Sequence, residues 1–444
     1  MRDLFAALPD DPAPPLADGY LGEVLRRGRR SVRRRRIGTA AAWTAVVLAL
    51  VAVLLPGVPR PAGPAAPAHR PSLPDRFAGY STLTSTVERS APGRAIALYT
   101  FGNGETFNMF QSLVVGADAD TYRRVDDMER HDLAMGLLSP DGTRVLVGDD
   151  RGATSELTLV DLTTGRRRSI GLGAPLGVRP LAWSPDGRYA AYSATALEPS
   201  DMSAGFSVET PVLDHGTLRL LDVETGRSTE IPAIKGPWTA AFAPGGARLA
   251  VQVAQDVHLL DLNGHEEGVV PIGAGRGLVA GVGWSPDGRF LATVPWVSGT
   301  SDHDSFITDN VDATFVPLDP ATPTPSPLHD VARVLGWRDP DHAIAAAVNA
   351  SGRLSLIEIT LPTNERRVLS RFDAGSSCEL GMQHCEVIDL QLAAGLLPDL
   401  DVRTARSPDR GPWPWLLRVP VAALLTTAAA LTWFLMRRRA RRAR

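Results

Sequence analysis

Two thirteen-residue stretches decide the fold: LAWSPDGRYAAYS at residues 181–193 and VGWSPDGRFLATV at residues 282–294. Each predicts a strand that ends in tryptophan, a tight turn and a second strand. In a type I turn, serine caps the turn, proline presets φ and glycine takes the last position. A pattern that returns after 101 residues predicts a repeat protein. The residues expected to build the two turns are Trp183, Pro185, Asp186, Gly187, Trp284, Pro286, Asp287 and Gly288.

Weaker copies of this turn occur along the chain, so that prolines 92, 140, 185, 244, 286 and 340 follow one another at intervals of 42 to 59 residues. Each interval also contains an apolar strand that closes on an acidic residue and a turn. Four short strands in a unit of this length are typical of a β-propeller blade. We expect the acidic residues to fix turns and to have no catalytic role. They are Asp161, Asp222, Asp261, Asp319 and Glu358.

These motifs resemble the WD-like repeat of TolB-type propellers, through the W-S-P-D-G-R turn and the L-x-x-D-x-x-T-G strand that follows it. The resemblance covers roughly residues 76–372 and implies an all-β fold, a six-bladed β-propeller. A seven-bladed propeller remains the alternative, because residues 386–392 (EVIDLQL) either start another blade or complete an existing one. No activity is implied, since propellers host binding proteins, scaffolds and enzymes alike.

Charge is segregated along the chain although the net charge is only −3. Residues 1–36 carry nine arginines against five acidic residues, and residues 437–444 carry six arginines and no acid, so the segment between them is acidic.

Residues 37–55 are uncharged and long enough to cross a bilayer. The 36 residues that precede this apolar segment are too many for a cleaved signal peptide, so we expect a membrane anchor that is retained. Residues 413–436 predict a second crossing, with tryptophans at its interface.

The positive-inside rule then places both arginine-rich ends in the cytosol and the acidic propeller outside the cell. This arrangement resembles membrane-anchored proteins of actinobacterial type. The basic tail is expected to orient the anchor; as an alternative, it forms an amphipathic helix that touches lipid or a cytosolic partner. The expected segments are a cytoplasmic tail (1–36), a transmembrane helix (37–55), a Pro/Ala-rich linker (56–75), the extracytoplasmic propeller (76–402), a linker (403–412), a second transmembrane helix (413–436) and a cytoplasmic tail (437–444).

The two cysteines, Cys378 and Cys385, follow the last clear unit and are expected to form a disulfide outside the membrane. His384 beside them is a second candidate metal ligand, but two ligands do not make a zinc site. We therefore predict no metal at this position.

Two connections are longer than their counterparts, at residues 195–214 and 297–313. Both fall between the same pair of blade strands, so both should emerge on one face, where repeat proteins often bind partners. We predict a binding rim with two phenylalanine anchors. Calcium binding by the second insert, through its aspartates and His303, and plain solvated loops are the alternatives. The candidate rim residues are Glu198, Asp201, Phe206, Glu209, Asp302, Asp304, Phe306, Asp309 and Asp312.

Catalytic signatures are absent from the sequence: it has no G-x-S-x-G elbow, H-E-x-x-H pair, phosphate-binding loop or dinucleotide fingerprint. We therefore predict a protein that is not an enzyme, has no cofactor and binds no nucleic acid. The predicted function of the protein is to bind a protein, peptide or envelope polymer and to pass a signal to the cytosolic tail. A structural scaffold of the cell envelope is the first alternative. A propeller hydrolase or lyase that works from the central channel is the second.

Overall fold

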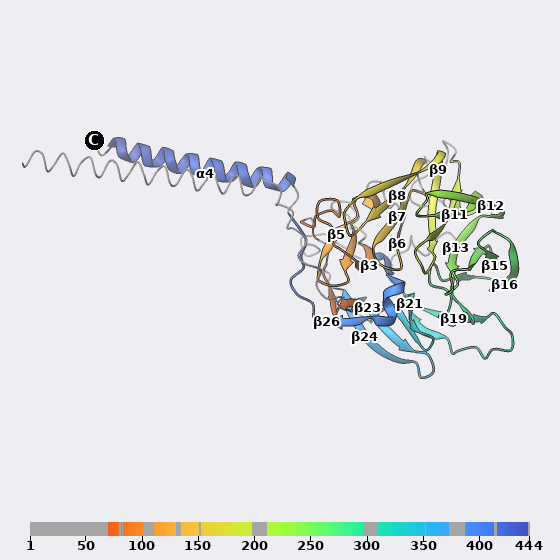
Figure 1. The fold of residues 1–444 in the computed structure, drawn as a ribbon. Helices are drawn as coiled ribbons and strands as arrows, with labels where there is room; N and C mark the ends of the chain where they lie inside the picture. The colour runs from red at the N-terminus through yellow and green to blue at the C-terminus, as the bar shows by residue number, and fades with distance from the viewer. Residues whose placement is uncertain are drawn as a thin grey trace, which may run out of the picture. The chain divides into compact units, whose positions relative to one another are not determined.

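The computed structural model describes residues 70–79, 81, 83–101, 111–129, 135–150, 152–197, 211–295, 309–350, 352–372, 387–412 and 415–442. Two compact units make up the chain, one from Pro61–Trp413 and the other from Met1–Arg60 together with Pro414–Arg444. The first unit is built from β-strands, which Figure 1 shows as consecutive antiparallel groups.

Three sheets of the first unit contain one group of consecutive strands each. One joins β13 (Pro237–Phe242), β14 (Arg248–Val253), β15 (Asp256–Asp261) and β16 (Glu266–Pro271). The next joins β17 (Arg276–Leu278), β18 (Phe290–Pro295), β19 (Val311–Pro317) and β20 (Leu328–Val331). The third joins β21 (Arg333–Asp339), β22 (His342–Val348), β23 (Leu354–Thr360) and β24 (Glu365–Phe372), with β2 (Arg76–Phe77) parallel to β24 at its edge.

A fourth sheet brings the two ends of this unit together. It has the order β25-β3-β4-β5, from β25 (Val387–Leu392), β3 (Ala95–Phe101), β4 (Gln111–Gly116) and β5 (Tyr122–Arg124). Leu392 of β25 lies opposite Ala97 of β3. The segment predicted either to start a blade or to complete one therefore completes the first sheet.

A further sheet has seven strands and is continuous through one long strand. Residues 167–176 of this strand pair with the strand before it, and residues 177–183 pair with the strand after it. Division at this point yields two four-stranded groups, one on each side of residue 177. The strands are β6 (Met135–Leu138), β7 (Arg144–Gly148), β8 (Thr154–Asp161), β9 (Arg167–Trp183), β10 (Tyr189–Thr195), β11 (Thr217–Asp222) and β12 (Arg227–Lys235).

The apolar core lies between neighbouring groups of strands. One cluster, for example, packs Phe290 and Phe315 of the β17–β20 sheet against Trp337 of β21. Similar clusters join each group to the next, and the last joins β21–β24 back to the first sheet, where Leu356 lies with Tyr99. Groups that pack face to face in a closed series form a propeller. The predicted all-β, propeller-like fold is confirmed.

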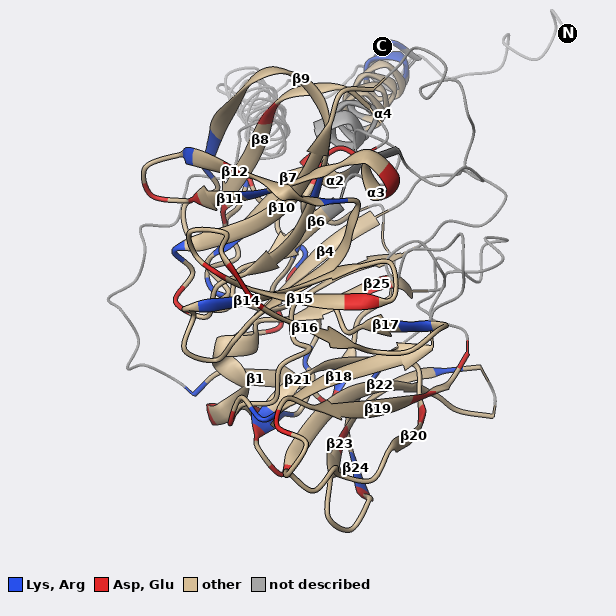
Figure 2. Cartoon of the chain, turned by 90° about the vertical axis from the view of Figure 1, so that its right-hand side faces the viewer, with Lys and Arg blue, Asp and Glu red and all other residues tan. Residues whose placement is uncertain are grey.

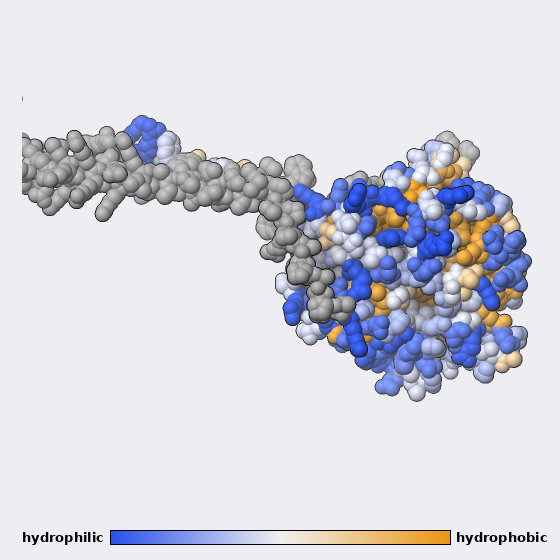
Figure 3. All heavy atoms as spheres, in the orientation of Figure 1, coloured by the Kyte–Doolittle hydropathy of each residue, from blue (hydrophilic) through white to orange (hydrophobic). Residues whose placement is uncertain are grey.

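The Ser-Pro-Asp-Gly stretches form turns between the first and second strands of their groups. The Ser184 hydroxyl donates to Asp186 at 2.5 Å and accepts the Tyr189 N–H at 2.8 Å. Gly187 has a φ of +68° and donates to the Ser184 carbonyl. Charged residues gather at such turns and at strand ends, whereas the strand centres are mostly uncharged (Figure 2). The face of this unit in Figure 3 is mostly hydrophilic, with smaller hydrophobic patches.

The first and last strands of the unit pair with each other. β1 (Ser72–Pro74) runs parallel to β26 (Asp401–Arg403), and both lie where linkers were predicted to end or begin. Arg403 fixes this pairing: its guanidinium donates to the carbonyls of Gly116 and Ala119 at 3.0 and 2.9 Å and to Asp120 at 2.9 Å. The polar segment that follows is bound as well, because Arg123 donates to the Asp409 carbonyl at 2.6 Å.

The second unit contains one described helix, α4 (Trp415–Arg442), 28 residues long. Its side chains Leu424, Leu431 and Phe434 are exposed. Of the helices in the described part of the chain, none has both the length and the apolar character that a membrane span requires. The predicted crossing at 413–436 is therefore not supported. The predicted crossing at 37–55 and the tail at 1–36 lie outside the described residues.

Candidate functional site

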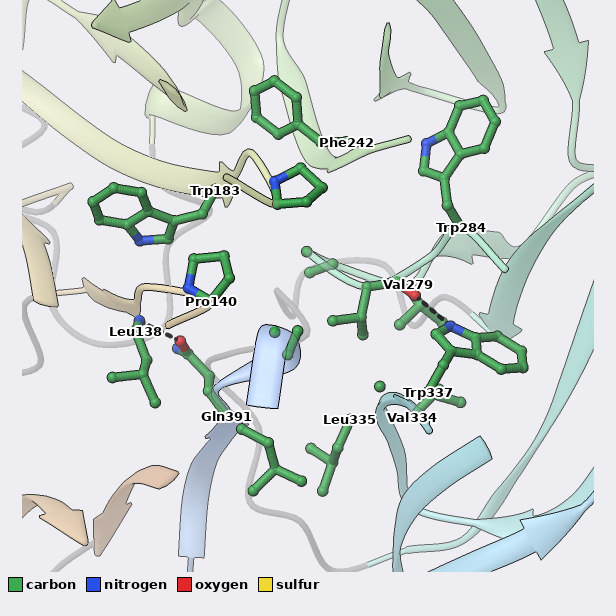
Figure 4. Close-up of a pocket in the computed structure, with 18 of the residues that line it drawn as sticks. Leu138, Pro140, Trp183, Phe242, Val279, Trp284, Val334, Leu335, Trp337 and Gln391 are labelled. Carbon is green, nitrogen blue, oxygen red and sulfur yellow. Dashed lines mark hydrogen bonds between the residues drawn. The ribbon is translucent and has the colours of Figure 1, made fainter. Parts of the chain in front are cut away.

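A pocket of about 340 Å³ lies where the inner strands of the propeller converge (Figure 4). Its wall combines the ends of β6, β9, β13, β21 and β25 with the segment after β17 and the 3-10 helix η3 (Ala394–Asp399). All but three of the lining residues are apolar or glycine. Four prolines of the repeated turns contribute to it: Pro140, Pro185, Pro244 and Pro286.

Three tryptophans of the pocket are held by the group of strands that precedes each of them. The indole Nε1 of Trp183 donates to the Leu137 carbonyl at 3.1 Å. Trp284 and Trp337 repeat this contact with the carbonyls of Ala241 and Val282, both at 2.9 Å. Figure 4 shows the last of these bonds beside the cavity. The N–H donor of each indole thus has an acceptor within the protein, so the indoles present apolar surface to a ligand.

Each of the three polar residues in the wall is engaged with other protein groups. Arg333 pairs with Asp389 at 2.9 Å, and both side chains are almost fully buried. The Gln391 amide accepts the Leu138 N–H at 3.0 Å and donates to the Gly136 carbonyl at 2.7 Å and to Asp389 at 2.9 Å. These contacts join β25 to β6 and β21, the inner strands of the two neighbouring groups. Their role is to position the wall.

Arg338 is the third polar residue, and it stands where two other units have Ser184 and Ser285. Its Nε donates to Glu358 and its Nη1 donates to the carbonyl of Leu400 at 2.8 Å. Its Nη2 is buried and has no hydrogen-bond partner among the described residues. A buried donor without an acceptor is costly, and because this nitrogen has almost no accessible surface it does not border the cavity.

The helix η3 closes part of the pocket. Ala394, Gly395 and Pro398 line the cavity, and the N–H of Gly395 donates to the Pro140 carbonyl at 2.9 Å. Leu397 is fully buried against Gly336, whose φ of +148° and lack of a side chain permit the approach. η3 therefore lies against the same strand that carries Arg338.

The predicted rim is only partly described. Glu198, Asp201, Phe206, Glu209, Asp302, Asp304 and Phe306 lie outside the described residues, and Asp309 and Asp312 are described. Asp312 pairs with His329 at 3.0 Å, and the hydrogen bond from His329, the largest contribution, lowers the pKa of its carboxyl. The described residues contain no group of three or more potential metal ligands. Cys378, His384 and Cys385 also lie outside the described part of the chain.

Both inserts connect the second and third strands of their groups, β10 to β11 and β18 to β19. The Ser-Pro-Asp-Gly turns connect the first and second strands. In an antiparallel group these two connections lie at opposite ends. The pocket, which the turn prolines line, is therefore at the end of the sheets opposite to the inserts, and the sequence reasoning did not find it.

Four of the five repeated acids cap turns. Asp161 accepts the Thr163 and Thr164 N–H groups, Asp222 accepts that of Thr225 and Asp319 accepts that of Ala321. Asp261 accepts the His265 N–H at 2.8 Å. Glu358 differs: it is buried and shared by Arg338 and Arg367. The expectation that Glu358 fixes a turn is therefore wrong, because the arginines beside it require a carboxylate.

Comparison with known proteins extends only to the fold. No family model and no curated protein matches the chain. Among solved structures, it is similar to TolB from Acinetobacter baumannii at 15% identity, covering 68% of this chain and 67% of the other, with a TM-score of 0.42. An oligogalacturonate lyase in complex with manganese is 14% identical, with 66% and 78% covered and a TM-score of 0.39. A putative TolB from Agrobacterium tumefaciens is 16% identical, with 63% and 90% covered and a TM-score of 0.36.

Proposed function

We propose that this chain is a membrane-anchored, extracytoplasmic β-propeller that binds a ligand in the pocket at its channel and relays occupancy to the cytosolic tail. The observation that carries the proposal is the pocket itself. It is concave, mostly apolar and bounded by a few fixed polar groups, which is the usual character of a ligand site. Its volume of about 340 Å³ suits a small molecule or a single side chain of a partner.

The chemistry of the wall favours binding over catalysis. General acid-base and nucleophilic catalysis need groups such as histidine, carboxylate, cysteine or serine at the reacting atoms. The residues that line the pocket include none of these types. A hydrolase or lyase that worked from this pocket would lack its catalytic group. A metal or cofactor is not part of the proposal.

The anchoring part of the proposal rests on the sequence. Residues 37–55 and 419–436 carry no charge, and arginines flank both on the side away from the propeller. In α4, the exposed Leu424, Leu431 and Phe434 form a surface that needs an apolar environment. Both termini would then be cytoplasmic. Tagging each terminus and testing its protection from external protease in intact cells checks this topology.

Photo-crosslinking in living cells tests the binding function. A photoreactive residue at Ala280 probes the pocket wall, and a second at Asp309 probes the end of the second insert. Glu267, exposed on the edge strand β16, is the matched control. We expect a discrete adduct from Ala280 that Glu267 does not give. An adduct from Asp309 alone contradicts the pocket and favours the rim, and no adduct from either favours the envelope scaffold.

A further inference from the structure

The polar side chains of the pocket wall are bonded to other groups of the protein. Arg333 pairs with Asp389 at 2.9 Å, and Arg338 pairs with Glu358. The Gln391 amide accepts one backbone N–H of β6 at 3.0 Å and donates to a backbone carbonyl of the same strand at 2.7 Å. Each guanidinium in the wall therefore has a carboxylate beside it, and the wall itself carries no free charge.

The backbone of the wall is also poor in hydrogen-bond donors, because prolines without an N–H form much of it. These residues are Pro140, Pro185, Pro244, Pro286 and Pro398. Two of the glycines among them use their N–H groups within the protein: Gly281 donates to the Ala240 carbonyl at 2.8 Å, and Gly395 donates to the Pro140 carbonyl at 2.9 Å. A ligand therefore meets ring carbons where other residues would offer backbone donors.

The charges next to the turn prolines are balanced locally. Asp141, Asp186 and Asp287 each follow a proline of the wall, and each accepts the hydroxyl of the serine that begins its turn at 2.5 to 2.6 Å. An arginine stands two or three residues after each aspartate, and Arg289 donates directly to Asp287. The turns thus bring carboxylates and guanidinium groups in equal number, which favours neither an anion nor a cation nearby.

Aromatic side chains line the pocket over four consecutive groups of strands (Figure 4). They are Trp183, Phe242, Trp284 and Trp337. The neighbouring groups on either side place Leu138 and Leu392 in the wall. The indole N–H groups are bonded to carbonyls of the preceding groups, so the rings contribute apolar contact area.

We propose that this pocket takes a small uncharged molecule with an apolar body; the inference rests on the proposed ligand-binding function and names its ligand class. An ion that entered the cavity would lose its water and gain no partner from the wall, which is costly. An apolar body gains free energy when it leaves water and packs against the tryptophan and proline rings. The volume of about 340 Å³ lies near the lower end of the range for ligand pockets, so the molecule is small.

The test compares three soluble probes of similar size on the full chain in lipid nanodiscs, with empty nanodiscs as the blank. They are 4-phenylbutan-1-ol, 4-phenylbutyrate and 4-phenylbutylamine, and calorimetric titration at neutral pH, where the acid and the amine are ionised, measures each Kd. We expect the alcohol to bind at least about tenfold more tightly than either ion. Hydrogen exchange at residues 394–400 should slow with the alcohol, because η3 lines the cavity.

Substitutions at Ala280, in the pocket wall, locate the effect. Ala280→Phe should fill the cavity and abolish binding of the alcohol, whereas Ala321→Phe, at an exposed position outside the wall, should leave it unchanged. Ala280→Asp places a carboxylate in the wall and should shift the preference toward the amine. This variant is read as a change of selectivity, so it does not depend on a loss of binding.

Two outcomes overturn the inference while the pocket remains a ligand site. One is an ionised probe that binds the native chain as tightly as the alcohol and is lost in Ala280→Phe. The other is a preference of Ala280→Asp for the alcohol that equals that of the native chain. Alcohol binding that persists in Ala280→Phe places the molecule elsewhere and also overturns it. Failure of all three probes to bind, in contrast, counts against a small-molecule site and so against the proposed function.

Discussion

Trp337 of β21 donates its indole N–H to the carbonyl of Val282, 2.9 Å away in the preceding group of strands. The bond crosses the boundary between two groups and is partly buried beside their shared core. Trp183 and Trp284 make the same bond to their own preceding groups. The tryptophan of the repeat thus joins neighbouring units.

Trp337→Phe should destabilise the propeller by about 1–3 kcal/mol, because the Val282 carbonyl is left without its donor while most of the apolar contact remains. The free energy of unfolding, from urea denaturation of the full chain in detergent, measures the effect. Trp433→Phe in α4 is the control and should leave propeller unfolding unchanged. Equal unfolding of native protein and Trp337→Phe would contradict the proposed joining role.

Arg403→Met should release the paired ends of the propeller. Asp120, whose side chain is 6% exposed, loses its ionic partner, and removal of one member of a buried pair typically costs about 3–5 kcal/mol. We expect faster hydrogen exchange in β1 and β26 and earlier proteolytic cleavage between residues 401 and 412. Arg406→Met, at an exposed neighbour, is the control. Native-like protection of β1 in Arg403→Met would show that the strand pairing holds without this arginine.

Gly336→Ala should displace η3. The φ of +148° is one that L side chains rarely adopt, and a Cβ at this position would overlap the Leu397 side chain. We expect a loss of about 1–3 kcal/mol and faster exchange at residues 394–400. Gly268→Ala is the matched control, because a Cβ there meets no atom within 4 Å. If both alanine variants behave alike, packing of Leu397 does not hold η3 in place.

Acidic pH should destabilise the turn that Asp261 caps. Hydrogen bonds from the backbone and side chain of His265 lower the pKa of Asp261 from 3.8 to about 2. A carboxyl with a lowered pKa in the folded state contributes stability above its ordinary pKa and loses this contribution as the pH falls through the folded value. Stability should therefore decline between about pH 4 and 2. NMR titration of the Asp261 carboxyl checks the value, and His265→Ala should raise it.

Much of the fold was predictable because its signals are local. The turns around Pro185 and Pro286 carry their own geometry, and the repeat spacing predicts the propeller. The continuity of β9 was not predictable, because the stretch GLGAPLG at residues 171–177 has the composition of a turn. The pocket depends on contacts between distant residues. Arg338, for example, departs from the local motif and meets Leu400, 62 positions along the chain.

The pairing of β25 with β3 has a consequence for synthesis. β3 ends at Phe101, and its inner neighbour begins only at Val387. While a ribosome produces the chain at about 5–20 residues per second, the first sheet waits roughly 15–60 seconds with an open edge. Open strand edges invite pairing with other chains. The propeller of the nascent protein is therefore not closed during this interval. A chaperone that shields the edge of β3 in that time would keep it from pairing with other chains.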